Sequence, residues 1–157
     1  MTELLKKLHA CKESIIWAEN KTWEDIYNTC HRGDWLLWLF KRTNPGDFQL
    51  LTLAKGHCAN TVRHLMKDKR SKIAVDVAIA FGEGEATIEE LNNAAYAAYA
   101  ANAAAYAADA AYDADADADA ANAAAYAAYD ADAARKENQM LTANIIRKYI
   151  KIEKFNI

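Results

Sequence analysis

A block of 41 residues, from Ala94 to Ala134, constrains the fold of this chain more than any other stretch. It contains 26 Ala, 7 Asp, 6 Tyr and 2 Asn, and it has no Gly, Pro, β-branched or basic residue. Because alanine has the highest intrinsic helix propensity and nothing in the block breaks a helix, we predict that it is α-helical. An isolated Ala-rich helix is only marginally stable in water. The rest of the chain, or a second copy of it, must therefore supply a surface for the block to pack against.

The block carries an internal repeat. The residues 101–108 recur unchanged at 121–128, a shift of 20 positions. At about 100° per residue in an α-helix, this shift places the two copies on nearly opposite faces. Either the chain reverses between the copies, near the aspartate run from Asp113 to Asp119, or one long helix uses both of its faces.

Length favours the reversal. An uninterrupted helix over 88–153 would be roughly 100 Å long, whereas a compact domain of this size has a radius of gyration of about 15 Å. Aspartate is a poor residue for the middle of a helix and like charges repel, so the aspartate run is the weakest part of the block. We expect an antiparallel hairpin of two long helices, with the helix interrupted between Tyr112 and Ala120.

Before the block, apolar residues recur at helical spacing. The run from Trp35 to Phe40 is apolar all round, and because no second strand-like run could pair with it, we expect a core helix. A capping box of Thr87 and Glu90 begins the first long helix. We expect five earlier helices, over Thr2 to about Asn20, Trp23 to Gly33, Asp34 to Arg42, Asn44 to Leu65, and Ser71 to Phe81. Asp34 and Asn44 are expected as N-caps, and Pro45 as the first residue of its helix. Gly33 and Gly82 are expected to end their helices.

These patterns predict an all-α fold, a single-domain helical bundle of about seven helices whose last two are long and Ala-rich. Residues 1–157 are expected to form one domain, in which 1–87 make a core of short helices and 88–157 make the Ala-rich long helices.

Charge is segregated along the chain, although the formal net charge is only -3. Residues 1–93 carry 13 acidic and 13 basic side chains, 94–134 carry 7 acidic and no basic ones, and 135–157 carry 2 acidic and 6 basic ones. An acidic middle block favours a basic protein partner over nucleic acid or an anionic membrane.

Cysteine and histidine do not form a metal-binding pattern. Cys11, Cys30 and Cys58 are an odd number at wide spacing, unlike a secreted disulfide framework, and the chain has no C-x2-C or H-x3-H pair. We expect the three thiols to be unpaired and free of metal, each on the apolar face of a different helix. The chain has neither the residue order of a signal peptide nor an apolar run of membrane-spanning length, so we expect a cytoplasmic protein.

No catalytic or cofactor-binding motif is recognisable. The chain lacks a phosphate-binding Gly-rich loop, and no Ser or Cys stands beside a base and an orienting carboxylate in a known motif. We therefore expect a protein that is not an enzyme and has no cofactor. Trp35 and Trp38 could anchor a partner, as interface aromatics do, but in so apolar a run we expect them in the core.

The Ala-rich block can pack inside the domain, bind a partner, or do both on opposite faces. Small side chains allow a partner to approach closely, Tyr adds contact area at low entropic cost, and Asp supplies negative potential. A merely solvated acidic face is the alternative. The partner-binding residues that we predict are Tyr106, Asp109, Tyr112, Asp113, Asp115, Asp117 and Asp119.

Several motifs resemble the immunity proteins of bacterial polymorphic toxin systems, and also proteins encoded by phages. The resemblance covers nearly the whole chain, and its most specific part is Arg32 to Leu39. It implies an all-helical, non-enzymatic protein that binds and neutralises a toxin in the cell that makes it, and it supplies no catalytic residues. The motifs are Ala10-Cys11, Trp17, Cys30 followed by 32–39, Cys58, 84–87 before Glu89-Glu90-Leu91, and the Ala/Tyr/Asp block.

The leading hypothesis is thus an immunity-type inhibitor that binds a basic toxin or effector protein through its acidic Ala/Tyr/Asp helices. One alternative is a structural module that self-associates as a close-packed homodimer of Ala-rich helices. A phage anti-defence binding protein is the other.

Overall fold

The computed structural model describes residues 1–113 and 135–157, and the side chains of 1–100 and 135–157. The described residues are helical and contain no strand, which confirms the all-α class for this part of the chain. Residues 135–149 form a helix that we call the C-terminal helix. The other elements are α1 (Thr2–Lys7), α2 (Lys12–Trp17), α3 (Trp23–Thr29), α4 (Gly33–Thr43), α5 (Phe48–Asn60), η1 (Arg63–Leu65), α6 (Lys69–Glu83), α7 (Ile88–Asp113) and η2 (Ile152–Lys154).

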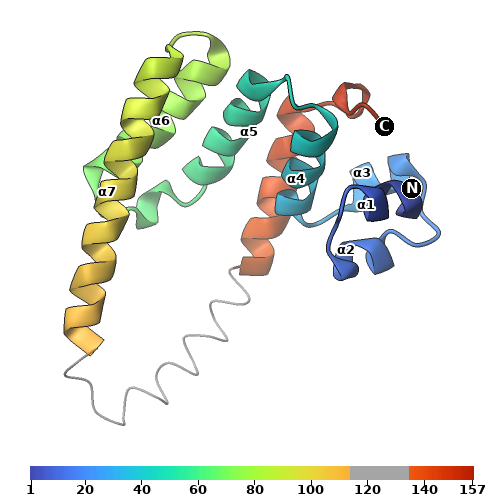
Figure 1. Ribbon diagram of the computed structural model, residues 1–157, viewed down its shortest axis with the longest axis horizontal. Coiled ribbons are helices and arrows are strands. Elements are labelled where there is room, and N and C mark those ends of the chain that lie inside the picture. The colour runs from blue at the N-terminus through green and yellow to red at the C-terminus, as the bar shows by residue number, and fades with distance from the viewer. Residues whose placement is uncertain (114–134) are drawn as a thin grey trace.

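The C-terminal helix is the central element of the main core (Figure 1). Its residues Ala143 and Ile146 are fully buried and belong to one apolar cluster with residues of α1, α3, α4 and α5. On the α4 side, the backbone of Thr142 lies so close to Gly33 that a Cβ on this glycine would be 2.8 Å from it. On the α5 side, the Cys58 thiol donates to the carbonyl oxygen of Thr142 at 3.8 Å. The last segment of the sequence thus completes the core that the first helices begin.

Tyr27 and Arg147 join α3 to the C-terminal helix by reciprocal hydrogen bonds. The Tyr27 hydroxyl donates to the carbonyl oxygen of Ile150 at 3.1 Å. In return, the Arg147 guanidinium donates to the carbonyl oxygens of Tyr27, at 2.6 Å, and Cys30. Carbonyls at the end of a helix have no partner within the helix. Arg147 therefore satisfies two acceptors that the end of α3 would otherwise leave open.

Phe155, beyond the C-terminal helix, closes the same core. Its ring centroid lies 4.9 Å from that of Trp23, 6.0 Å from that of Tyr27 and 5.2 Å from that of Phe40. Contacts of this kind add specific edge-to-face attraction to the burial of apolar area. Both chain termini accordingly lie at the end of the molecule that α1–α3 occupy (Figure 1).

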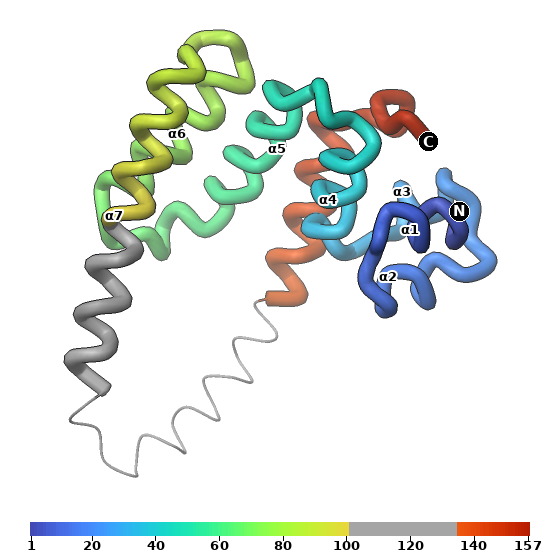
Figure 2. The backbone as a smooth tube through the Cα atoms, in the orientation of Figure 1, coloured from blue at the N-terminus to red at the C-terminus, as the bar shows by residue number. Residues whose placement is uncertain are grey.

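α5, α6 and α7 run side by side at the other end of the molecule (Figure 2). Glycine makes the α5–α6 contact possible, because a Cβ on Gly82 would lie 2.6 Å from the Cα of Leu53. Likewise, a Cβ on Gly56 would lie 2.8 Å from a side-chain carbon of Ile79. Only glycine tolerates such a close approach of two helices. α6 is thereby held firmly on α5, and α7 packs on α6.

Two of the predicted helix starts are confirmed by their capping hydrogen bonds. The Thr22 hydroxyl accepts from the Asp25 N–H at 3.1 Å, and the Asp25 carboxylate accepts from the Thr22 N–H at 3.0 Å. The same reciprocal pair joins Thr87 and Glu90, at 3.2 and 2.7 Å. The predicted core helix is also confirmed, since Leu36, Leu39 and Phe40 of α4 are buried.

The single first helix was a wrong prediction, because α1 and α2 are separate. His9 takes a positive φ of 61°, the Ala10 N–H donates to the carbonyl oxygen of Leu5 at 2.9 Å, and the His9 N–H donates to that of Lys6 at 3.0 Å. These bonds form a Schellman motif, which ends a helix. The apolar spacing continues across the break and hides it.

The predicted roles of Gly33, Asp34, Asn44 and Pro45 are wrong. Gly33 is the first residue of α4 and does not end α3, while the Asp34 carboxylate is held by the Arg32 guanidinium at 2.6 and 2.8 Å and does not cap. α5 begins at Phe48 after Asp47. The Asn44 amide donates to the carbonyl oxygen of Lys154 at 2.6 Å. Its side chain is thus engaged in fixing the C-terminal segment.

The fifth predicted helix is longer than expected, since α6 continues through Gly82 to Glu83 and ends at Gly84, which has a φ of 83°. Cys11 is exposed at the start of α2, which contradicts its predicted place on an apolar face. Cys30 is buried and Cys58 half-buried, and all three cysteines are free thiols. The hairpin and the single-domain organisation stay predictions, because 114–134 lie outside the described residues.

Candidate functional site

One face of α7 presents a line of exposed residues, which we call the Tyr stripe: Glu89, Asn92, Tyr96 and Tyr99. Their spacing of three, four and three residues places them along one side of a helix. Tyr96 and Tyr99 are 76% and 75% exposed, and with Asn92 they line a shallow depression. The stripe is therefore an aromatic surface that no described residue covers.

Packing on α6 explains why this face is outward. Ala94 is buried and Leu91 and Ala98 are half-buried, and these three positions lie on the side of α7 opposite to Tyr96. The short side chains of Ala94 and Ala98 suit a close contact between two helices, so the apolar side of α7 packs on α6. The bulky tyrosines are left on the side that faces away.

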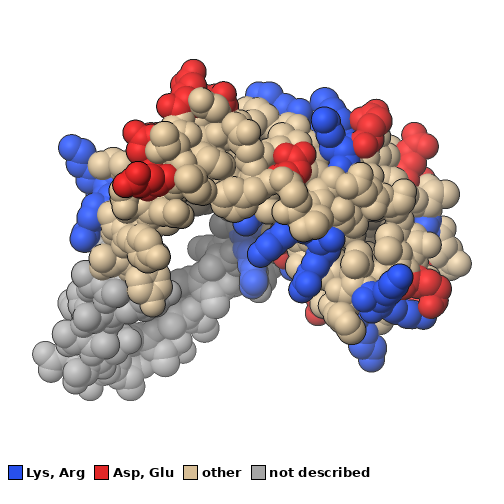
Figure 3. Space-filling view, turned by 45° about the horizontal axis from the view of Figure 1, so that its top comes forward, with Lys and Arg blue, Asp and Glu red and all other residues tan. Residues whose placement is uncertain are grey.

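The stripe begins at an acidic end of the molecule. Glu83, Glu85, Glu89 and Glu90 are all exposed around the α6–α7 loop, and none forms an ion pair within the described residues. Figure 3 shows acidic side chains grouped at this end. The N–H and hydroxyl groups of Thr87 donate to Glu90 and hold the pKa of its carboxyl below the usual range. The tyrosines thus adjoin a region of negative potential.

The predicted binding residues fall at or beyond the far end of α7. Tyr106, Asp109, Tyr112 and Asp113 are part of this helix, but their side chains are outside the described set. Asp115, Asp117 and Asp119 lie outside the described residues. These seven assignments stay predictions, and sequence reasoning did not include the Tyr stripe, although its spacing after the Thr87 cap was readable.

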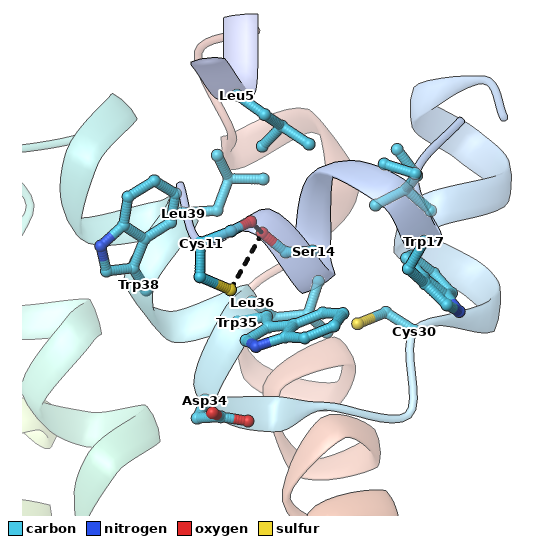
Figure 4. A pocket seen from close by; sticks show the side chains of 12 residues that line it. Leu5, Cys11, Ser14, Trp17, Cys30, Asp34, Trp35, Leu36, Trp38 and Leu39 are labelled. Atoms are coloured by element: carbon cyan, nitrogen blue, oxygen red, sulfur yellow. Dashed lines mark hydrogen bonds between the residues drawn. The ribbon is translucent and has the colours of Figure 1, made fainter. Parts of the chain in front are cut away.

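A second feature is an open apolar pocket of about 340 Å³ between α2 and α4, which we call the tryptophan pocket. Figure 4 shows Trp17 and Trp38 on opposite sides of the view, with Trp35 between them. All three indoles are half-buried and pack against the core, so the prediction that Trp35 and Trp38 lie in the core is partly correct. The residues that line the pocket are Leu5, Cys11, Ser14, Trp17, Ala18, Ile26, Cys30, Asp34, Trp35, Leu36, Trp38 and Leu39.

Each of these three tryptophans carries a cation on its ring. Lys21 lies over Trp17 with its Nζ 4.5 Å from the ring centroid. The Cζ of Arg32 lies 4.6 Å from the ring centroid of Trp35, and the Cζ of Arg42 lies 5.7 Å from that of Trp38. Cation–π attraction favours such pairs. Three cations thus lie beside the aromatic walls of the pocket, and we call Lys21, Arg32 and Arg42 the basic rim.

The polar groups of the pocket are already engaged. The Ser14 hydroxyl donates to the carbonyl oxygen of Cys11 at 2.8 Å and accepts from the Cys11 thiol at 3.4 Å. Hydrogen bonds from Arg32 hold the pKa of Asp34 below its ordinary value. Burial raises the pKa of the Cys30 thiol. Burial thus favours the neutral thiol at Cys30, and Arg32 favours the ionised carboxylate at Asp34.

The described part of the chain was also considered for metal-binding side chains and for membrane-spanning helices. Residues 1–113 and 135–157 hold no group of three His, Cys, Asp or Glu side chains placed to bind a metal ion. Within the same ranges, no helix is long and apolar enough to cross a membrane.

No protein-family model matches the sequence, and searches of curated proteins and of solved structures return no significant match.

Proposed function

We propose that this protein is an immunity-type inhibitor, which binds and neutralises a basic toxin or effector protein through the outward face of α7 and the acidic residues that follow it. The observation that carries the proposal is the exposure of Tyr96 and Tyr99 on one face of a helix that is packed from behind. Exposed tyrosines on a helix are suited to bind a protein, because their contact area costs little conformational entropy.

The chemistry around the stripe indicates what kind of partner would fit. Ala95 and Ala100 beside the tyrosines are exposed and small, so a partner's backbone can come close to α7. Glu89 and its acidic neighbours precede the stripe, and the aspartate-rich residues follow it in sequence. A surface with aromatic contacts between two acidic regions favours a partner with exposed apolar and basic side chains.

In this proposal, the predicted residues Tyr106, Asp109, Tyr112 and Asp113 extend the surface, and Asp115, Asp117 and Asp119 add three further negative charges. The chain is a single domain, and its Ala-rich block is an antiparallel hairpin that reverses near the aspartate run. The protein acts by occupying its partner's surface, so it needs neither a catalytic residue nor a cofactor.

The test is co-expression with the product of the neighbouring reading frame. The parent chain should relieve the growth defect caused by that product, and the double variant Tyr96→Ala/Tyr99→Ala should not. A matched control is Ile16→Ala/Leu65→Ala, which removes apolar residues that are 54% and 66% exposed elsewhere on the surface. Equal protection by the two double variants would contradict the assigned surface.

Light scattering separates the proposal from self-association. The inhibitor should be monomeric alone and form a defined complex with its partner. A stable dimer of the parent that Tyr96→Ala/Tyr99→Ala dissociates would instead assign the stripe to a contact between two copies.

A further inference from the structure

We propose that the tryptophan pocket is a binding site for a small amphipathic carboxylate, whose apolar chain enters the pocket and whose carboxylate meets the basic rim. This inference does not depend on the inhibitor function, because the pocket lies in the α1–α4 part of the core and the Tyr stripe lies on α7. Its volume of about 340 Å³ is at the small end of the range for ligand pockets, roughly 300–1,000 Å³.

The interior of the pocket suits an apolar chain. Its lining includes Ile26, Leu36 and Leu39, which are all buried residues of the core. Ser14 and Cys11 satisfy each other's hydrogen bonds, as described above. A ligand that brought a polar group into this interior would find no open partner for it, which would cost binding free energy.

The rim suits an anion. Arg32 is neutralised by the Asp34 carboxylate, with Glu13 also nearby, but Lys21 and Arg42 form no ion pair within the described residues. The Lys21 amine already donates to the carbonyl oxygen of Trp17, whereas the Arg42 guanidinium makes no hydrogen bond within those residues. Arg42 is therefore the cation most available to a ligand's carboxylate.

A cationic ligand fits less well, although aromatic walls with a carboxylate often bind ammonium groups. Cations of the chain already lie over all three rings. The one carboxylate, Asp34, accepts both of its hydrogen bonds from Arg32, at 2.6 and 2.8 Å. An ammonium ligand would have to displace these groups.

Isothermal titration of the full chain with decanoate, below its critical micelle concentration, tests the proposal. Decyltrimethylammonium has a ten-carbon chain, which matches the total carbon count of decanoate, and the opposite charge, and it should bind about tenfold more weakly. The variant Lys21→Gln/Arg42→Gln should weaken decanoate about threefold to fivefold and leave the affinity for decanol unchanged. Equal binding of the two charged probes to the parent chain would overturn the proposal.

A pair of variants locates the site. Cys11 is exposed at the mouth of the pocket, and Cys11→Phe should fill the mouth and abolish decanoate binding. Ile16→Phe adds the same ring to the same helix at an exposed position that does not line the pocket, and should bind as the parent does. If Ile16→Phe loses as much affinity as Cys11→Phe, the binding occurs elsewhere.

Protection of Cys11 from alkylation can be measured on the parent chain, so this test does not depend on the folding of a variant. Saturating decanoate should slow the alkylation of Cys11 by iodoacetamide at least about fivefold, because its alkyl chain would cover this thiol, while decyltrimethylammonium at the same concentration should slow it about twofold at most. An unchanged alkylation rate at saturation would place decanoate outside the pocket and overturn the assignment.

Discussion

His57 of α5 stacks face to face on Tyr149 of the C-terminal helix, with ring centroids 4.1 Å apart and planes 8° from parallel. The Nε2 atom of His57 is buried and has no hydrogen-bond partner within the described residues. Burial lowers the pKa of His57 below its ordinary 6.5, and nearby Lys148 lowers it further, while Glu83 opposes the shift. The neutral imidazole is therefore the form that the packed core accepts.

This contact predicts a pH dependence of stability. Because the pKa of His57 is lower in the folded than in the unfolded chain, the unfolded chain binds more protons as the pH falls below about 6.5. The stabilisation that neutral His57 contributes should therefore be fully present above that pH, and the free energy of unfolding should decrease as the pH falls below it. Urea unfolding at pH 7.5 and 5.5 measures the change. His57→Phe keeps the stack without a titrating group, and it should lose less stability between these two values than the parent chain does.

Arg147 is expected to stabilise the fold through hydrogen bonds more than through its charge. Arg147→Met would leave the carbonyl oxygens of Tyr27 and Cys30 without their donors, which should cost about 1–3 kcal/mol. The control is Arg70→Met, whose side chain pairs with the Asp68 carboxylate alone at the surface, and its loss should leave stability nearly unchanged. Chemical denaturation gives the free energy of unfolding of both variants. A similar loss in the two would show that the hydrogen bonds of Arg147 do not stabilise the fold more than an exposed ion pair does.

Gly33 should not tolerate even one added carbon. A Cβ at this position would lie 2.8 Å from the backbone of Thr142 and Ala143, so Gly33→Ala should push the C-terminal helix away from α4 and cost about 1–3 kcal/mol. A Cβ on Gly46 would meet no atom within 4 Å, and Gly46→Ala is the matched control. Thermal unfolding should separate the two, and equal melting temperatures would refute the close contact.

Alkylation should distinguish the three thiols. Cys11 is exposed, whereas burial raises the pKa of Cys30 and brings that of Cys58 to about 11. Because the thiolate is the reactive form, Cys11 should be modified first and the other two only after unfolding. Mass spectrometry of the native chain, digested after timed alkylation, identifies the order. Early modification of Cys58 would contradict its place beside Thr142.

The parts of the fold that were predictable from the sequence are those fixed by local interactions. The capping boxes at Thr22 and Thr87 each satisfy their own donors within four residues, so the residue pattern is sufficient. The run of α4 is apolar on all sides, so burial in the core could likewise be predicted from the sequence. Gly33 and Asn44 were misread because their roles depend on residues about 110 positions away, at Thr142 and Lys154.

The candidate sites follow the same division. The helical spacing of the Tyr stripe can be read from the sequence. The side of α7 that α6 covers cannot, because it depends on how the two helices pack. The tryptophan pocket needed the fold itself, because Trp17 and Trp35 come together, 6.1 Å between ring centroids, only when α2 packs on α4. The break at His9, which separates α1 from α2, makes that packing possible and left no clear signal in the apolar pattern.

The acidic residues at and beyond the end of α7 should act mainly on the rate at which the partner associates. Attraction between opposite charges steers two proteins together, and exposed charges are screened over about 8 Å at physiological ionic strength. Changing Asp109, Asp113, Asp115, Asp117 and Asp119 to Asn should therefore mimic high salt without unfolding the chain. Tyr96→Ala/Tyr99→Ala should instead speed dissociation, because it removes short-range contacts.

The most direct test of the binding surface is the rate constant for association with the product of the neighbouring reading frame. It is measured by stopped flow across a salt series for the parent and the Asn variant. The parent should associate more slowly as salt is added, and the Asn variant should be slow at low salt and nearly independent of it. If the two chains associate at the same rate at every ionic strength, the acidic surface does not guide recognition and the proposed binding face is wrong.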